Sequence, residues 1–301
     1  MWDSLDPRSL EPRDREPSDP RDAEDLDPRD VFARGLELPH GSERERVHVH
    51  EHDFEIRGSE VRTLAVVGAF RVVPVDDLSD QRGRSGDLWH GDLDRLRTAG
   101  LIRTVAPLDR PDRERTTLIA LTRRGRDLLE RHRKSNHEPH QAFYADVVKR
   151  RELAHDAQLY RAYLRTAERL HEQGARINRV VLDYELKREY QTFLQERNRD
   201  RSDSDGRPDR SAEEIERWAQ EHQLPMVDGR VQFPDFRIER EWQDGRRDVE
   251  DVEVMTPHYR GAHAAAKARS GFTRFRSGGS RVGGRAGGRS PDPHLAEEFL
   301  D

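Results

Sequence analysis

The stretch VQFPDFRIE (residues 231–239) is followed by Asp244-Gly245 and then by VEDVEVM (residues 249–255). Both segments are rich in β-branched and aromatic residues, and Asp-Gly is a strong hairpin signal, so the stretch predicts two antiparallel strands. On the second strand Glu253 alternates with valines, which places the acids on one face and the valines on the other. We therefore expect Asp235 and Glu253 to lie on neighbouring strands at a polar face of a sheet.

Two carboxylates on adjacent strands suggest metal chemistry, because Mg²⁺ takes oxygen ligands. The arrangement resembles the core of PD-(D/E)XK nucleases, in which Asp235 matches the Pro-Asp aspartate, Glu253 the second acid and Glu185 the helical glutamate. A lysine of that core helps to orient the attacking water. Its position is Met255 here, and Lys267, on the helix expected after Pro257, is the alternative. The resemblance implies a site with these catalytic candidates: Asp235, Glu253, Lys267 and Glu185, with Asp235 and Glu253 as ligands of Mg²⁺.

Residues 57–135 predict three helices, a β-hairpin and a last helix. Ser59 caps the first helix, Pro74 breaks it, and Gly100 ends the third helix. Strands are expected over 101–105 and 116–121, and Thr122 caps the last helix. The pattern LxxLxxxGLI (residues 93–102) followed by LTxxGxxLL (residues 121–129) resembles the winged helix-turn-helix domains of bacterial transcription regulators.

In that motif the third helix enters the major groove and the hairpin reaches the DNA backbone. Candidate DNA-binding residues around the third helix and at the wing are Arg82, Arg84, Ser85, Trp89, His90, Arg95, Arg110, Arg113 and Arg115. Three acids on or near the same helix, Asp87, Asp92 and Asp94, would repel phosphate. A winged helix that binds protein is therefore the alternative to one that binds DNA.

The remaining segments complete a four-part organisation. Residues 1–56 predict a disordered acidic tail and linker, because proline and alternating charges cannot offset the entropy of ordering. Within it His48, His50 and His52 alternate, which would place three imidazoles on one strand face; an extended linker is favoured over a metal site. Residues 136–276 predict helices over 142–173 and from Asp183 and Ser211, a strand over 177–182, the strand pair, and a helix over 258–275. Residues 277–301 predict a flexible Gly/Arg-rich tail.

Composition limits the class of protein. The chain has 301 residues, a formal net charge of −6, 38% charged residues and no cysteine. Disulfides, zinc–thiolate sites and cysteine nucleophiles are excluded. No apolar run approaches the ~20 residues of a membrane helix, and the first residues do not resemble a signal peptide. We expect a cytoplasmic protein with no membrane partner.

The order of these parts resembles the replication-relaxation family over residues 57–276. Its members are bacterial proteins of plasmids, phages and other mobile elements. The resemblance implies an α+β fold, a winged helix followed by an α/β nuclease-like domain, and double-stranded DNA as partner. Three hypotheses follow: a DNA-binding protein of a mobile element with an inactive nuclease-like domain that supplies a second contact or a homodimer surface, a Mg²⁺-dependent DNA endonuclease, and a protein–protein adaptor.

Overall fold

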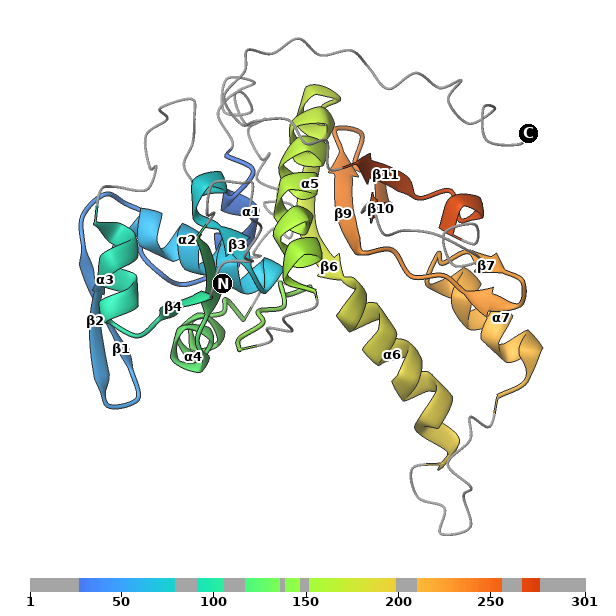
Figure 1. Ribbon diagram of the computed structural model, residues 1–301, viewed down its shortest axis with the longest axis horizontal. Helices are drawn as coiled ribbons and strands as arrows, with labels where there is room; N and C mark the ends of the chain where they lie inside the picture. The colour runs from blue at the N-terminus through green and yellow to red at the C-terminus, as the bar shows by residue number, and fades with distance from the viewer. Residues whose placement is uncertain are drawn as a thin grey trace, which may run out of the picture.

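The structure is a computed structural model that describes residues 27–78, 91–105, 117–135, 139–146, 152–198, 210–255 and 267–276. It is a mixed α+β fold, and Figure 1 shows the long helix α5 (Leu153–Glu172) between two groups of elements. One group holds α1 to α4 and β1 to β5, and the other is built on β6, β9, β10 and β11. Among the described helices, none has the length and apolar character that a bilayer crossing requires.

The described part of the N-terminal segment is folded. Helix α1 (Asp30–Ala33) and the hairpin of β1 (Glu45–Val49) and β2 (His52–Ile56) precede α2. Phe32 is buried, with its ring centroid 5.4 Å from that of Phe70. The prediction of a disordered tail and linker over 1–56 is therefore wrong for 27–56, because its few apolar residues insert into the core; residues 1–26 lie outside the described part.

The three alternating histidines do not share a strand face. His50 lies in the hairpin turn with a positive φ of 54°, while His48 is on β1 and His52 on β2. The Nδ1 atom of His48 lies 2.9 Å from Oδ1 of Asp53, and the ring of His50 accepts from Arg131. The expectation of one strand is wrong because the chain reverses at His50.

The next elements follow the expected order. They are α2 (Gly58–Phe70), β3 (Val73–Pro74), the 3₁₀ helix η2 (Val75–Asp77), α3 (Asp92–Thr98), β4 (Ile102–Val105), β5 (Leu118–Leu121) and α4 (Arg123–Arg131). The strands form an antiparallel sheet of order β3-β5-β4. Gly100 ends α3 with a φ of 69°, and the hydroxyl of Thr122 accepts from the amide of Gly125 at 3.1 Å. Both local signals act as expected.

The second group contains β6 (Ala175–Leu182), α6 (Asp183–Gln195), η3 (Glu196–Asn198), α7 (Ala212–Glu221), β7 (Met226–Val227), β8 (Arg230–Val231), β9 (Phe236–Trp242), β10 (Arg247–Met255) and β11 (Thr273–Arg276). The main sheet has the order β11-β10-β9-β6. Strand β9 is antiparallel to both of its neighbours, and β11 is parallel to β10. Ser211 and Glu214 form the expected capping box of α7.

Three expected elements have different bounds. The helix expected over 142–173 begins at Leu153, since residues 142–146 are not helical and bury Phe143 and Tyr144. The strand expected over 231–239 is divided, because β8 ends at Val231 and β9 begins at Phe236. The helix expected over 258–275 is wrong at its end, where a turn at Gly271 (φ 75°) leads into β11.

One apolar core joins both groups of elements. The ring of Phe70 at the end of α2 lies 5.3 Å from the rings of Tyr160 and Tyr163 on α5 and 6.5 Å from Phe236 on β9. Val252 and Val254 of β10 also enter this core, as their alternation with Glu253 predicts. The boundary expected between residues 135 and 136 therefore does not divide the packing.

Candidate functional site

Asp235 lies directly before β9, at the end of the main sheet where this strand begins. Its amide donates to the carbonyl of Val252 and its carbonyl accepts from the amide of Asp183, both at 3.0 Å. Pairing between β9 and β10 ends at Phe236 and Val252. Two residues further along β10, the amide of Val254 donates to Oδ2 of Asp235 at 2.7 Å. The Pro-Asp aspartate thus satisfies a backbone donor that β9 no longer reaches.

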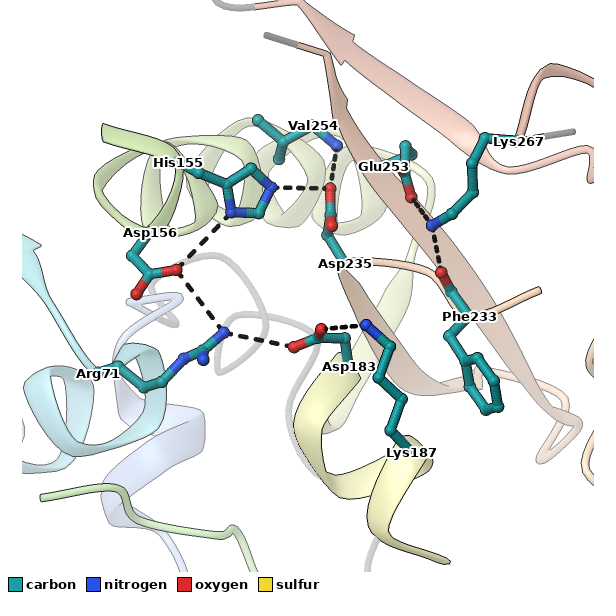
Figure 2. A network of polar contacts seen from close by, with 10 residues as sticks. All are labelled: Arg71, His155, Asp156, Asp183, Lys187, Phe233, Asp235, Glu253, Val254 and Lys267. Atoms are coloured by element: carbon teal, nitrogen blue, oxygen red, sulfur yellow. Dashed lines mark hydrogen bonds and ion pairs between the residues drawn. The ribbon is translucent and has the colours of Figure 1, made fainter. Parts of the chain in front are cut away.

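His155, at the start of α5, points at the same carboxylate (Figure 2). Its Nε2 atom lies 3.2 Å from Oδ2 of Asp235, and its Nδ1 atom lies 3.7 Å from Oδ1 of Asp156. Burial opposes a charge on the ring, but the neighbouring carboxylates of Asp156 and Asp235 outweigh it and raise the pKa of His155 to about 10. Burial also opposes the charge on Asp235, yet the contact with His155 lowers the pKa of Asp235. The ring is therefore an imidazolium at neutral pH.

Glu253 and Lys267 form a second acid–cation pair beside the first. Glu253 is 2% exposed on β10, and Nζ of Lys267 lies 2.7 Å from its Oε2 atom. The same ammonium donates to the carbonyl of Phe233 and lies 5.4 Å from the ring centroid of Phe272. The expectation that Lys267 reaches the acid from another direction agrees with this geometry.

Glu185 is held by other residues. Its Oε1 atom lies 3.3 Å from Nη1 of Arg179, and its Oε2 atom accepts from the hydroxyl of Tyr144 at 3.4 Å. Burial raises the pKa of Glu185, with Arg179 acting in the opposite direction. Within the described residues, no three His, Asp or Glu side chains converge as metal ligands would. The expected group of four catalytic candidates is thus divided, with Glu185 apart from the two acid–cation pairs.

The charge network continues to the end of α2 (Figure 2). Arg71, the C-cap of α2, has a positive φ of 65° and a buried side chain. Its Nη2 atom lies 3.6 Å from Oδ1 of Asp156 and 3.3 Å from Oδ1 of Asp183, which also binds Lys187 at 2.7 Å. A continuous chain of charges therefore connects α2, through His155 on α5, to the end of the main sheet.

The residues present do not fit a resident Mg²⁺ ion as they stand. Oδ2 of Asp235 already accepts from two donors, and Glu253 is paired with an ammonium. A hard divalent cation needs several free oxygen ligands. An open depression of about 720 Å³ along β10, at Val249 and Glu250, contains none of the predicted site residues. The chain's own cations, rather than a metal, balance the acids here.

Helix α3 exposes arginines and hides one acid. Arg95 is 53% exposed, with Nε 3.5 Å from Oε1 of Glu60, and Arg97 is 60% exposed and binds Asp94 at 2.9 Å. The other predicted DNA-binding residues, and Asp87, lie outside the described residues: Arg82, Arg84, Ser85, Trp89, His90, Arg110, Arg113 and Arg115. Arg95 is therefore the one member of that set whose position is described.

Asp92 has a structural role. It is 1% exposed, accepts from the hydroxyl of Ser59 at 2.9 Å and from Arg44 at 3.2 Å, and forms a hydrogen-bonded ion pair with Arg57. The expectation that it repels phosphate is wrong, because the side chain turns into the body of the protein and anchors the start of α3 to α2. Asp94 remains an exposed acid on this helix.

Sequence reasoning missed two residues of the network. A lone histidine on an amphipathic helix is usually a surface or core residue, so the sequence gives His155 no functional signal apart from the adjacent Asp156. Arg71 carries no motif. Both depend on the first turn of α5 lying at the end of the main sheet, which local sequence does not encode.

Comparison with protein-family models found no match, and comparisons with curated proteins and with solved structures found none either. Inference about function therefore rests on the chain's own residues and their geometry.

Proposed function

We propose that this protein binds double-stranded DNA through a winged helix over residues 57–135 and that its second half is a nuclease-like domain without cutting activity. The observation that carries the proposal is the sheet of order β3-β5-β4, with α2, η2 and α3 before β4. This order of helices and strands is the one expected of a winged helix, whose third helix enters the major groove. Helix α3 is the third helix in this order.

The charges of α3 support contact with phosphate. Arg95 and Arg97 are exposed, while Asp92 is turned inward to Arg57 and Ser59. Exposed arginines supply the sequence-independent part of DNA affinity by releasing counterions. The inward position of Asp92 also weakens the argument for the protein–protein adaptor, which rested on acids of this helix.

The second half supports the nuclease-like part of the proposal. Helix α5 is followed by three strands in sheet order β6-β9-β10, and β11 lies parallel beside β10. The Pro-Asp aspartate precedes the second strand, Glu253 is on the third, and Lys267 precedes the fourth. These positions resemble the PD-(D/E)XK core. Because His155 and Lys267 neutralise both acids, we propose that this half supplies a second DNA contact or a homodimer surface.

The biological setting is part of the same proposal. The joint order of winged helix and nuclease-like domain resembles the replication-relaxation family, so we place the protein in the cytoplasm of a bacterium that carries a mobile element. Its action on DNA would serve replication or mobilisation of that element. A titration against origin-region duplexes and unrelated duplexes from one plasmid would test it, since preferential binding to the origin region is expected.

DNA binding can be tested by fluorescence anisotropy of a labelled duplex at several salt concentrations. We expect the affinity to fall steeply with salt, and the double variant Arg95→Gln/Arg97→Gln to reduce the salt slope by about two. The matched control is Arg246→Gln/Arg247→Gln, which removes two exposed arginines at the β9–β10 turn. No binding at low salt, or equal slopes for wild type and the α3 variant, would exclude contact by α3.

A metal-dependent endonuclease is the second candidate, and it is favoured by the presence of a lysine, Lys267, beside the acids of the sheet, where Met255 replaces the expected lysine. The ion pair of Lys267 with Glu253 opposes metal binding and ranks this candidate second. It predicts nicking of supercoiled plasmid with Mg²⁺ or Mn²⁺ that is lost in Asp235→Ala and in Glu253→Ala. Absence of nicking with either metal, at protein concentrations that saturate DNA binding, would remove this candidate.

A further inference from the structure

We propose that His155 lies in the place that a divalent metal ion would take between Asp235 and Asp156, so that this end of the sheet takes up no metal. The inference rests on the proposed nuclease-like domain, and it concerns a residue to which the nuclease resemblance assigns no role. It also explains how the acids of such a domain persist in a form that does not bind Mg²⁺.

The ring bridges two carboxylates, as a bound cation does. Nε2 faces Oδ2 of Asp235 at 3.2 Å, and Nδ1 faces Oδ1 of Asp156 at 3.7 Å. The ring therefore stands between two carboxylates, within hydrogen-bond reach of Asp235 and within ion-pair distance of Asp156. Bridging of carboxylate oxygens is also how Asp and Glu bind Mg²⁺ and Ca²⁺.

Asp156 supplies a second, independent observation. Its side chain is 2% exposed, and its Oδ1 atom has no hydrogen-bond partner, although it is buried and directed at the ring. Its charge is balanced by His155 and by Arg71, whose Nη2 atom lies 3.6 Å away. A buried carboxylate oxygen without a hydrogen-bond partner is suited to contact with a cation.

The balance of charge explains why a metal is excluded. Arg71 and His155 together match Asp156 and Asp235, and Lys267 matches Glu253. A divalent ion would have to displace the ring and leave a buried excess of positive charge, which is costly. Replacing His155 by a neutral residue reverses this situation, because Asp235 and Asp156 then lack their shared cation.

The test measures metal binding by the full chain, using calorimetric titration with Mn²⁺ and thermal unfolding in EDTA or Mn²⁺. Wild type is expected to bind no Mn²⁺ at this site and to unfold at the same temperature in both conditions. His155→Gln, which is neutral, is expected to unfold at lower temperature in EDTA and to gain a saturable rise of roughly 2–4 °C with Mn²⁺. His155→Lys keeps a cation and is the matched control, with no gain expected.

Each outcome decides the inference. The inference is supported if Mn²⁺ raises the melting temperature of His155→Gln and this rise disappears in His155→Gln/Asp235→Asn. The inference would be overturned if wild type bound Mn²⁺ and Asp235→Asn removed that binding. It would also be overturned if His155→Gln folded and took up no Mn²⁺. If His155→Gln does not fold, the titration of wild type with Mn²⁺ tests the inference by itself. Fluorescence anisotropy with duplex DNA on the same samples separates the two proposals. If wild type does not bind DNA, the proposed function is refuted, whereas the result on metal binding is unaffected.

Discussion

Phe70 tests whether the two groups of elements unfold as one body. The side chain is fully buried, and its ring centroid lies within 5.4 Å of the rings of Phe32, Tyr160 and Tyr163 and 6.5 Å from that of Phe236. Removing a packed phenylalanine costs about 3–5 kcal/mol through lost transfer energy and the cavity that remains. We therefore expect Phe70→Ala to lower the free energy of unfolding of the whole molecule by ~4 kcal/mol.

Tryptophan fluorescence during urea unfolding provides the assay. Trp218 on α7 and Trp242 on β9 belong to the second group of elements, and Phe70 belongs to α2 in the first. The assay uses a background in which Trp2 and Trp89 are replaced by phenylalanine. With a urea dependence of about 3 kcal/mol per molar for a chain of this size, the midpoint is expected to fall by roughly 1.3 M.

Tyr184→Ala is the matched control, because Tyr184 is a large aromatic side chain that is 51% exposed. Its midpoint is expected to change by less than about 0.3 M, since surface substitutions stay within ~0.5 kcal/mol. A fluorescence midpoint that stays in place for Phe70→Ala, while circular dichroism reveals a separate earlier transition, would refute the reasoning. The shared core would then not couple the two groups.

Three further predictions concern single polar residues. Asp92→Ala leaves Arg57 buried without this partner and is expected to cost about 3–5 kcal/mol in urea unfolding; a loss under ~1 kcal/mol would contradict an anchoring role. The pKa of His155 is raised from 6.5 to about 10, so its stabilisation is complete below pH 6.5 and is lost as pH rises through about 10. The gap in melting temperature between wild type and His155→Gln should therefore shrink from pH 7 to 10, and a constant gap would disprove the charged ring. Ser211→Ala removes the hydroxyl that accepts from Glu214 and is expected to cost ~1 kcal/mol, whereas Ser211→Asp should cost far less in the same assay.

Elements with strong local signals could be predicted from sequence. Thr122 and Ser211 cap their helices, Gly100 ends α3, and Asp244-Gly245 turns β9 into β10. Each signal acts through hydrogen bonds or backbone angles within a few residues, so it works independently of the rest of the fold. The same holds for the alternation on β10, where Val252 and Val254 are buried.

Elements that depend on distant partners could not be predicted. Residues 27–56 contain few apolar side chains, and their order comes from the insertion of Phe32 beside Phe70. Strand β11 is four residues long and exists because it pairs with β10 from Val252 to Met255. Burial and pairing with residues far along the chain outweigh local composition in both cases.

The candidate site divides in the same way. Sequence identified Asp235, Glu253 and Lys267 by residue type and spacing, and it identified the missing lysine at Met255. It could not show that His155 lies between two carboxylates, because that contact needs the first turn of α5 to lie at the end of the main sheet.

By itself the sequence determined the helices and strands that carry strong local signals between Gly58 and Met255, the acids of the sheet and the absence of cysteine chemistry. Periodicity, caps and turns are properties of neighbouring residues, so they survive without knowledge of the fold. The tertiary structure alone decided which charges meet: Asp92 turns inward, Glu185 pairs with Arg179, and His155 neutralises Asp235. Electrostatic partners are selected by distance and burial in space, and a linear chain specifies neither until it folds.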